Sequence, residues 1–425
     1  MSGVVKSIWI KGLWHQGLVG AGVWAERGFK VTAVCDSHDQ ALALMNSELP
    51  IYEPGLRELI SEQVSKGTLV FTALNSNLPT PDVLAIMHDT EVNEDDEVQL
   101  GRLLEDVKNF IPFITPSMEI FITAQVPAGT CDQIQKSLNL ALGFNPLISY
   151  MPENLRLGQA ISRFKNPELP VIGLSQPESK DNLRQLFSSD VDLRFCLILE
   201  AEILKSALNA FLSVAITFGN EVSEICDRLE ISGSVVMSLL KLEPRIGSGL
   251  PLMPGLPFSG GTLGRDVQNL RKLASGQGDV IEAIWSSNLH RKDYFIESVA
   301  SFAKSANQKS IGLLGLTYKT GTSTLRRSFP LQCAKDLDQM GFTIFGFDPM
   351  SNSFDEKIGA SVNLCSSIEE IFSVCDVLVI TTPWSEIIGS FTSELLRNKT
   401  IIDPYGVMPK DLIEACSYYQ FGGRI

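Results

Sequence analysis

Short apolar runs alternate with helical patterns along the first part of the chain. The runs SIWI (7–10), KVTAVC (30–35), DVLAIM (82–87), EIFITA (119–124) and PVIGL (170–174) read as buried strands. The stretches between them carry apolar residues at helical spacing. Strands that alternate with helices predict a parallel sheet that is covered by helices on both faces.

The pattern changes at about residue 197, where the strand signals stop. The stretch EAEILKSALNAFLSVAITFGNEVSEICDRL (200–229) keeps apolar residues at helical spacing over several turns. A polar passage, AKSANQKS (303–310), then leads into a second region in which apolar runs alternate with helical patterns. We therefore expect an α/β chain in which a helical segment over 197–302 joins two parallel-sheet regions.

The two sheet regions share one short pattern. ERGFKVTAVCD (26–36) and QMGFTIFGFD (339–348) both read as the end of a helix, a glycine, a strand and an aspartate. The match is too degenerate to call a sequence repeat, so we interpret it only as a weak similarity between the two regions.

Composition and charge place the chain among globular proteins. Its 425 residues, 44% hydrophobic and 20% charged, are enough for two or three domains with their own cores. No apolar run reaches the roughly 18 residues that a membrane span needs, and the first residues lack a signal-peptide pattern, so we expect no membrane association and a cytoplasmic location. The net charge of -14 argues against a nucleic-acid partner.

The cysteines, histidines and acidic runs indicate no metal site. Eight cysteines are scattered without C-x-x-C pairs, so we expect buried thiols rather than zinc ligands or disulfides. The acidic run from Glu94 to Asp96 is interpreted as a solvated loop, because hard-cation loops space their ligands differently. His88 follows the carboxyl end of a strand, where ligands collect, but an ordinary loop histidine is the preferred interpretation. For His15, two interpretations stay open: it contacts a phosphate, or it is an exposed turn residue.

The stretch IWIKGLWHQGLVGAG reads as a buried strand, a glycine turn and a helix, as at the start of a dinucleotide-binding unit. Gly12 permits the bend and Gly17 allows close packing, but Trp14 stands where the usual G-x-G-x-x-G has its second glycine. Asp36, at the end of the next strand, is placed to take the ribose hydroxyls, which favours NAD over NADP; Cys35 is the alternative for that position. On these residues alone, a turn that only connects the strand to the helix and binds no nucleotide is an equal alternative.

Seven separated motifs occur in order along nearly the whole chain. They are IYEPGL (51–56), VPAGT (126–130), PENLRLG (152–158), ILKSALNAFL (203–212), PRIG (244–247), GGTLGRDVQNL (260–270) and GLTYK (315–319). Together they resemble the UDP-glucose/GDP-mannose dehydrogenase family. The resemblance implies an N-terminal NAD-binding Rossmann domain (1–196), a central helical dimerisation domain (197–302) and a C-terminal Rossmann-like domain that binds the nucleotide sugar (303–425). It also implies a UDP-sugar as substrate and a homodimer or higher homo-oligomer.

The resemblance implies that a sugar alcohol is oxidised in two steps, with two NAD molecules and a cysteine thiolate that holds the intermediate. Lys205 and Asn209 match the family's lysine and asparagine, and their i, i+4 spacing puts both on one face of a helix, where they can stabilise an oxyanion. Asp266 matches the aspartate that completes this group. Glu153 matches the glutamate of the hydrolytic step.

One part of this machinery is missing. The family's nucleophilic cysteine falls at Thr262, whose hydroxyl is far less acidic than a thiol. Gln125 replaces a threonine expected near the nicotinamide, Arg265 a lysine and Leu157 a second acid, while DPYG (403–406) lacks an arginine. Because the losses mainly concern the second oxidation, we expect an NAD-dependent oxidoreductase that makes a single two-electron oxidation of a CH–OH group of a nucleotide sugar.

The motifs also assign binding residues and leave two alternatives open. Cofactor-binding residues are expected at Gly12, Trp14, Gly17, Asp36, Gln125, Arg265 and Arg326. Substrate-binding residues are expected at Asn154, Leu155, Arg245, Phe258, Gly260 and Lys319, with Arg245 reaching a neighbour's site. One alternative is a non-catalytic nucleotide-sugar binding or regulatory protein, which Trp14 would favour. The other is a full UDP-sugar 6-dehydrogenase with a displaced nucleophile.

Overall fold

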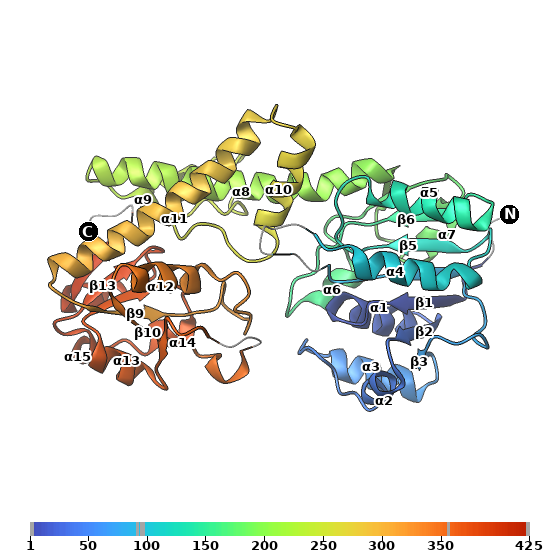
Figure 1. Ribbon diagram of the computed structural model, residues 1–425, viewed down its shortest axis with the longest axis horizontal. Helices are drawn as coiled ribbons and strands as arrows, with labels where there is room; N and C mark the ends of the chain where they lie inside the picture. Colours follow the sequence, from blue (N-terminus) through green and yellow to red (C-terminus); the bar gives the residue numbers. More distant parts are fainter. Residues whose placement is uncertain (1–3, 91–92, 94–97, 355–357, 422–425) are drawn as a thin grey trace. The chain divides into compact units, whose positions relative to one another are not determined.

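The computed structural model describes residues 4–90, 93, 98–354 and 358–421. The chain divides into two compact units, Met1–Ser206 and Ala207–Ile425, and the division falls inside one long helix. Each unit contains one sheet with helices on both faces (Figure 1). The prediction of two parallel-sheet regions and a helical segment is confirmed. The three domain boundaries of the sequence analysis stay predictions.

The sheet of the first unit has eight strands in the order β3-β2-β1-β4-β5-β6-β7-β8. All neighbours run parallel except β6 and β7. The strands are β1 (Ser7–Lys11), β2 (Lys30–Cys35), β3 (Leu69–Ala73), β4 (Val83–Ile86), β5 (Glu119–Ile122), β6 (Leu147–Tyr150), β7 (Val171–Leu174) and β8 (Arg194–Leu197).

Both faces of this sheet are buried, which explains the continuous apolar runs in the sequence. In β1, Ile8 and Ile10 join the core on one face and Trp9 the core on the other. Helices α1 (His15–Glu26), α2 (His38–Met45), α3 (Leu56–Ser65), α6 (Ala160–Lys165) and α7 (Ser179–Gln185) supply the first core. Helices α4 (Gly101–Phe110) and α5 (Thr130–Leu142), with the short η1 (Ile111–Phe113), supply the second.

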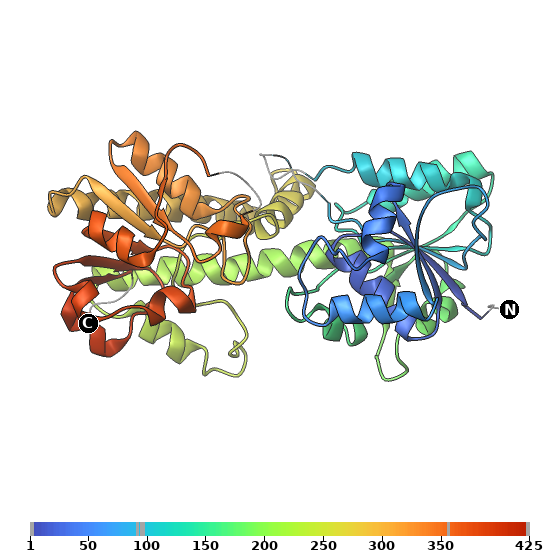
Figure 2. The same ribbon diagram turned by 90° about the horizontal axis from the view of Figure 1, so that it is seen from below.

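Helix α8 (Ile198–Arg228) is one unbroken helix (green in Figure 2). Within the described residues it alone is long and apolar enough to cross a membrane, by length and composition, where the sequence analysis expected no such run. It also carries buried polar side chains: Glu202, Lys205, Ser206, Asn209, Ser213, Thr217, Asn220, Ser223 and Glu224. Burying such polar groups in lipid costs free energy. These side chains are therefore those of a helix packed inside a folded protein.

The sheet of the second unit has six parallel strands in the order β11-β10-β9-β12-β13-β14. They are β9 (Ser310–Leu314), β10 (Thr343–Phe347), β11 (Asn363–Leu364), β12 (Val377–Ile380), β13 (Thr400–Asp403) and β14 (Ser417–Gln420). One face is covered by α11 (Asp279–Ser305) and α12 (Phe329–Gln339). The other is covered by α13 (Ile368–Val374), α14 (Ser385–Gly389), α15 (Ser393–Leu396) and η3 (Lys410–Ala415), and η2 (Ser351–Ser353) follows β10.

The helical part of the second unit has its own small cores. Helix α10 (Leu263–Ala274) packs through Val267 against Ala210 of α8 and Ile284 of α11. Helix α9 (Gly233–Leu240) packs through Met237 against Ala215 of α8. These contacts hold α10, which carries Arg265 and Asp266 and follows Thr262, against the helix that carries Asn209.

Candidate functional site

The glycine turn after β1 is as tight as the sequence predicts. Gly12 has φ +97°, and a Cβ there would lie 2.6 Å from the backbone carbonyl carbon of Met87, just after β4. A Cβ on Gly17 would lie 2.0 Å from the carbonyl oxygen of Gly12, so helix α1 packs directly against the turn. Only glycine fits both positions, which brings the N-terminus of α1 to the carboxyl end of the sheet, where dinucleotides bind.

Trp14 is the N-cap residue of α1 and makes no side-chain cap bond. Its side chain is 44% exposed, so the indole is not packed into the turn. His15, the first residue of the helix, lies with Nε2 2.9 Å from Oε2 of Glu53. Glu53 is buried and also accepts hydrogen bonds from the backbone N–H groups of Gly158 and Ala160. His15 is therefore tied to a buried carboxylate rather than being a bare turn residue.

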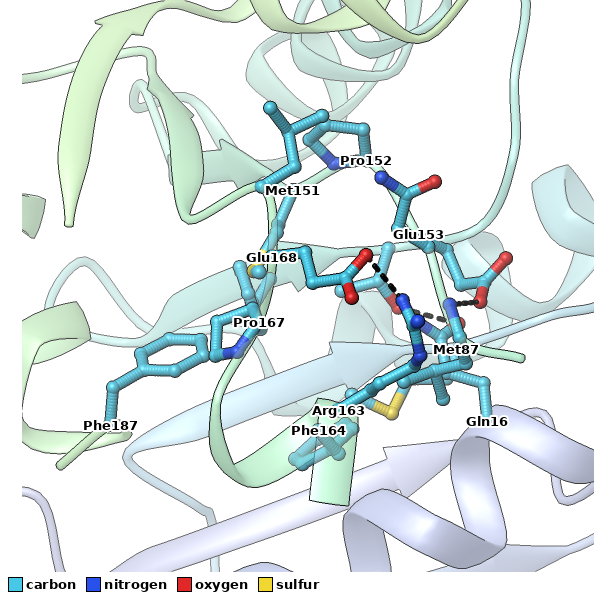
Figure 3. Close-up of a pocket in the computed structure, with 15 residues that line it drawn as sticks. Gln16, Met87, Met151, Pro152, Glu153, Arg163, Phe164, Pro167, Glu168 and Phe187 are labelled. Atoms are coloured by element: carbon cyan, nitrogen blue, oxygen red, sulfur yellow. Dashed lines mark hydrogen bonds and ion pairs between the residues drawn. The ribbon is translucent and has the colours of Figure 1, made fainter. Parts of the chain in front are cut away.

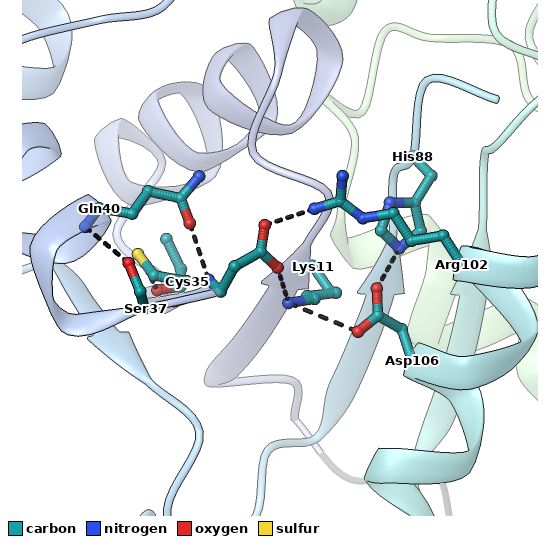
Figure 4. Close-up of polar contacts among 9 residues, drawn as sticks. Lys11, Cys35, Ser37, Gln40, His88, Arg102 and Asp106 are labelled. Atoms are coloured by element: carbon teal, nitrogen blue, oxygen red, sulfur yellow. Dashed lines mark hydrogen bonds and ion pairs between the residues drawn. The ribbon is translucent and has the colours of Figure 1, made fainter. Parts of the chain in front are cut away.

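Asp36 follows β2 and is held by two cations (Figure 4). Nζ of Lys11 donates to its Oδ1 at 2.5 Å, and the guanidinium of Arg102 donates to its Oδ2. Burial alone would raise the pKa of Asp36, but the hydrogen bond and charge of Lys11, followed by those of Arg102, hold it below the usual value. The carboxylate is thus ionised at neutral pH, and it lines a pocket of about 490 Å³.

Cys35 and His88 lie near this group. Burial raises the pKa of the Cys35 thiol to about 11, so it remains protonated at neutral pH. His88 is buried, with Nε2 2.8 Å from Oδ2 of Asp106 on α4. His88 lies in the loop after β4, and its side chain packs against this acidic partner.

Helix α8 holds the loop that follows β5. The side chain of Glu202 is buried and accepts hydrogen bonds from the backbone N–H of Gly129 at 2.6 Å and of Cys131 at 2.9 Å. It therefore takes the place of an N-cap side chain for α5, which has none of its own. In the same loop the carbonyl oxygen of Gln125 accepts a hydrogen bond from the hydroxyl of Thr90.

The loop that follows β6 carries Glu153, Asn154 and Leu155. Asn154 accepts a hydrogen bond through Oδ1 from Nζ of the buried Lys205, at 2.8 Å. The backbone N–H of Leu155 donates to Oε1 of Glu153. Burial raises the pKa of the Glu153 carboxyl above its usual value, although the charge of Lys205 opposes the shift. A carboxyl with a raised pKa beside a buried cation is typical of a catalytic site.

A small cavity of about 40 Å³ adjoins this loop (Figure 3). Gln16, Met87 and Thr123 line it, together with Glu153 and Asn154. The side chain of Gln16, in the first turn of α1, accepts a hydrogen bond from the hydroxyl of Thr123, which follows β5. The first turn of α1 and the carboxyl ends of β4, β5 and β6 thus meet in one place, as a cofactor at the switch point of a sheet requires.

The second unit brings together Asn209, Thr262 and Asp266. The side-chain amide of Asn209 on α8 donates to Oδ2 of Asp266 on α10, and both residues are buried. Thr262 is the exposed N-cap residue of α10 and makes no side-chain cap bond. Arg265 is buried beside Asp266, with Nε 3.8 Å from its Oδ1. Lys205 and Asn209 are one turn apart on α8, as the spacing predicts.

The expected substrate residues of the second unit fall into two groups. A Cβ on Gly260, which has φ +79°, would lie 2.7 Å from the ring of Tyr318, and the neighbouring Lys319 is exposed. The backbone N–H of Gly260 donates to the carbonyl of Arg327, next to the partly buried Arg326. Two residues lie elsewhere: Phe258 is buried in the α8–α10–α11 core, and Arg245 is exposed and pairs with Glu243.

The loop after β9 repeats the glycine turn of the first unit. Gly315 has φ +98°, and a Cβ there would lie 2.5 Å from Cβ of Thr382, just after β12. Asp348, which follows β10 as Asp36 follows β2, is fully buried. Its Oδ2 accepts from the backbone N–H groups of Leu316 and Thr317 at 2.7 and 3.0 Å, and its Oδ1 from the N–H of Met350 at 2.9 Å.

The described residues contain no group of three or more histidine, cysteine, aspartate or glutamate side chains that could hold a metal ion. The acidic run from Glu94 to Asp96 lies outside the described residues.

Comparison with known families identifies the family to which this chain belongs. Models of one family match residues 6–190 as its NAD binding domain, 199–289 as its central domain and 312–410 as its UDP binding domain. The chain belongs to the UDP-glucose/GDP-mannose dehydrogenase family. This is a family of NAD-dependent nucleotide-sugar dehydrogenases, as the seven sequence motifs predicted, and the cofactor is NAD.

Relatives match the chain over nearly its full length. A UDP-glucose 6-dehydrogenase of Rickettsia bellii is 28% identical over 432 residues, covering 97% of this chain and 98% of the relative. The UDP-glucose 6-dehydrogenase TuaD of Bacillus subtilis is also 28% identical and covers 99% and 94%. The solved UDP-glucose dehydrogenase of Pyrobaculum islandicum superposes with a TM-score of 0.85 at 24% identity, covering 99% and 98%, and confirms the fold.

The residues of the first unit fit NAD. The two glycines bring the amide groups at the N-terminus of α1 to the carboxyl end of the sheet, an arrangement that suits a diphosphate. The pocket beside Asp36 lies at the carboxyl ends of β1, β2 and β3, where the adenosine of a dinucleotide lies in this fold.

Sequence reasoning missed four residues: Lys11, Arg102 and Asp106 around Asp36, and Glu202 behind the β5 loop. Lys11 alone gave a signal, since a lysine closes the otherwise apolar run SIWIK of a central strand. Arg102, Asp106 and Glu202 read as ordinary charged residues of helices, and only the tertiary structure brings them to the site.

Proposed function

We propose that the protein is an NAD-dependent oxidoreductase that makes a single two-electron oxidation of a CH–OH group of a nucleotide sugar, with a UDP-sugar as the expected substrate. The alcohol carbon gives up a hydride and its hydroxyl a proton, so that one aldehyde or ketone, one NADH and one proton are formed. NAD supplies the hydride acceptor. The named activities of the relatives, UDP-glucose 6-dehydrogenases, support this substrate class.

The retained polar groups support the oxidation step. Lys205 is a buried cation on α8, and Asn209, one turn further on, is oriented by its hydrogen bond to Asp266. We propose that Lys205 and Asn209 stabilise the negative charge that develops on the alcohol oxygen as its proton leaves. Asp266 fixes the amide of Asn209. Glu153, whose pKa is raised, is the ionisable group on the β6 loop that can take up a proton.

The protonation state of the cysteine thiols is the observation that supports a single oxidation. Thr262 stands at the family's cysteine position, so a second oxidation through a thioester would need another thiolate. All eight cysteines lie within the described residues. Burial raises the pKa of every one of their thiols, to about 11 for Cys35 and Cys365 and about 12 for Cys375. Thiols of this kind are poor nucleophiles at neutral pH, which argues against a displaced nucleophile.

Trp14 favours the second candidate, a nucleotide-sugar binding protein without turnover. Its side chain has a Cβ and an indole at the N-cap of α1, where the family pattern has a glycine. The exposure of the ring argues against this candidate, because the indole does not fill the turn.

Two measurements test the proposal. Calorimetric titration with NAD should show binding. If no heat is released at millimolar NAD, both dehydrogenase candidates are excluded and only the nucleotide-sugar binding protein remains. A panel of UDP-sugars with NAD should then give one NADH per sugar consumed and a carbonyl product by mass spectrometry. Two NADH per sugar and a uronic acid would contradict the single oxidation and support a complete dehydrogenase.

We also propose a homodimer in the cytoplasm. The central domain of the family covers residues 199–289, and the sequence analysis predicts that this segment dimerises.

A further inference from the structure

Gln16 places an amide group at the start of α1, directly after the glycine turn. Its side chain is half-buried, and its Oε1 accepts a hydrogen bond at 3.0 Å from the hydroxyl of Thr123, which is itself buried. Among the residues that the structure describes, none accepts a hydrogen bond from its Nε2. The protein therefore holds the oxygen of this amide and leaves its two N–H donors to a ligand.

The surroundings of Gln16 are largely apolar. Met87 and Phe121 are buried and line the same small cavity as Gln16 (Figure 3). Binding sites for small molecules commonly have apolar walls with a few polar groups that fix the orientation of the ligand. A donor in such a wall has little competition from water, so its hydrogen bond is stronger than one at the surface.

The course of a dinucleotide across the sheet leads its nicotinamide half to Gln16. Asp36 follows β2 and is the expected partner of the adenosine ribose, and the N-terminus of α1 suits the diphosphate. The remaining half must then lie on the other side of β1, over the carboxyl ends of β4, β5 and β6. The hydrogen bond between Gln16 and Thr123 lies there, because Thr123 follows β5.

The position of the reacting groups leads to the same place. A hydride passes directly from the alcohol carbon to the nicotinamide ring, so the ring must lie next to the groups that hold the alcohol. Lys205, the proposed oxyanion donor, donates to Asn154 at 2.8 Å, and Asn154 lines the same cavity as Gln16. Glu153 also lines this cavity. Gln16 is thus on the side of the nicotinamide half that faces these groups.

We propose that Gln16 recognises the carboxamide group of the nicotinamide ring. Its Nε2 donates to the carboxamide oxygen, while Thr123 holds its Oε1 and so orients the donor. This bond sets the rotation of the ring about its link to the ribose, and therefore the face of the ring that receives the hydride. The inference rests on the proposed function only in that NAD must bind to the first unit.

Gln16→Met tests the proposal, because methionine has a similar length and no N–H donor. Calorimetric titration of the full chain should show NAD bound about 3- to 10-fold more weakly, the loss of one hydrogen bond. ADP-ribose, which lacks the nicotinamide ring, should bind as it does to the wild type. Gln133→Met, at an exposed glutamine on α5 that does not line the cavity, is the matched control and should change neither affinity.

Two outcomes of this titration would overturn the proposal. An unchanged affinity of Gln16→Met for NAD would exclude a hydrogen bond to the cofactor. An equal loss for NAD and ADP-ribose would place the effect in the glycine turn rather than at the nicotinamide ring.

A cofactor analogue and a second variant test which atoms take part. In 3-acetylpyridine adenine dinucleotide a methyl group replaces the amide nitrogen and the oxygen remains, so Gln16→Met should weaken this analogue as much as NAD. A loss for NAD alone would contradict Nε2 as the donor. Thr123→Val removes the hydroxyl that holds Oε1 and keeps the shape of the side chain, so it should weaken NAD about twofold or more and leave ADP-ribose unchanged. An unchanged affinity for NAD would contradict the orienting role of Thr123.

The outcomes distinguish this inference from the proposed function. If the wild type binds neither NAD nor ADP-ribose, the oxidoreductase proposal itself fails. If the wild type and Gln16→Met bind NAD equally well, only the inference about Gln16 fails.

Discussion

Lys205 is the residue on which the proposed chemistry depends most. It is buried on α8 and donates from Nζ to Asn154. Lys205→Met keeps the aliphatic chain and removes the cation, so turnover should fall by about 100- to 1000-fold, as for other oxyanion donors. NADH formation with the UDP-sugar that the wild type oxidises measures the change. Lys136→Met, at an exposed lysine on α5, should keep the wild-type rate. An unchanged rate in Lys205→Met would exclude this lysine from the reaction.

Glu119 makes the stability of the protein depend on pH. It is fully buried at the start of β5, and its Oε1 accepts a hydrogen bond from the hydroxyl of Ser149. Burial raises the pKa of its carboxyl from the usual 4.5 to about 7. Between these values the folded state keeps a proton that the unfolded state has lost, so the free energy of unfolding falls as the pH rises through this window, by up to about 3 kcal/mol.

Urea unfolding at pH 5 and pH 8 tests this prediction on the wild type and on Glu119→Gln. The amide does not ionise, so the variant should lose most of the difference between the two pH values. Glu105→Gln, at an exposed glutamate, should behave as the wild type does. The same pH dependence in Glu119→Gln would assign the effect to other groups.

Single residues set the limit of what the sequence could predict. Asp36, Lys205 and Asp266 could be proposed as site residues because they belong to spaced motifs. Arg102 and Glu202 were not, because each lies in another element and reaches the site only through tertiary packing. The burial of six of the cysteines was expected from their scatter, while Cys196 and Cys416 are only partly buried. Its chemical consequence, a raised thiol pKa at every position, needed the structure.

The secondary-structure elements were more predictable than the side-chain contacts. Buried parallel strands give continuous apolar runs, so β1, β2 and β4 could be located from the sequence alone. The similarity between residues 26–36 and 339–348 has a structural basis, because β1-α1-β2 and β9-α12-β10 have the same layout. In both, a glycine with φ near +98° follows the first strand. The antiparallel pairing of β6 and β7 was not predicted, since strand direction leaves no mark on composition.

The turn between β1 and α1 should tolerate no side chain at its glycine. Gly12 and Gly28 have φ +97° and +94°, but a Cβ on Gly28 meets nothing within 4 Å, whereas one on Gly12 meets the backbone after β4. Gly28→Ala should cost about 1 to 2 kcal/mol from the backbone conformation alone. Gly12→Ala should cost about 1 to 3 kcal/mol more, from the close contact. Equal losses in urea unfolding would contradict the tight approach.

At the scale of the whole molecule, the exposed side of α8 supports the predicted dimer. Phe211, Phe218 and Ile225 are 58%, 48% and 46% exposed, and their spacing of seven places them along one stripe of the helix. Exposed apolar stripes mark interaction surfaces, and we propose that a second copy of the chain covers this one.

Phe218→Glu tests this dimer. A charge in the middle of the stripe should shift the chain toward the monomer in sedimentation velocity. Leu140→Glu is the control, because Leu140 is 90% exposed on α5 and is not part of the stripe, and its replacement should leave the assembly unchanged. A Phe218→Glu variant that keeps the wild-type sedimentation coefficient would place the interface elsewhere.

The second unit has the glycine turn of a dinucleotide fold, but Asp348, the acid that follows its second strand, is closed to a ribose, whereas the side chain of Asp36 is 46% exposed. Asp348 is fully enclosed, and backbone N–H groups of Leu316, Thr317 and Met350 already donate to both of its oxygens. Although the glycine turn is present twice, we expect adenosine to be recognised only beside Asp36. Equilibrium dialysis with radiolabelled NAD should therefore saturate at one molecule per polypeptide, and a plateau at two would show that the second glycine turn also binds the dinucleotide.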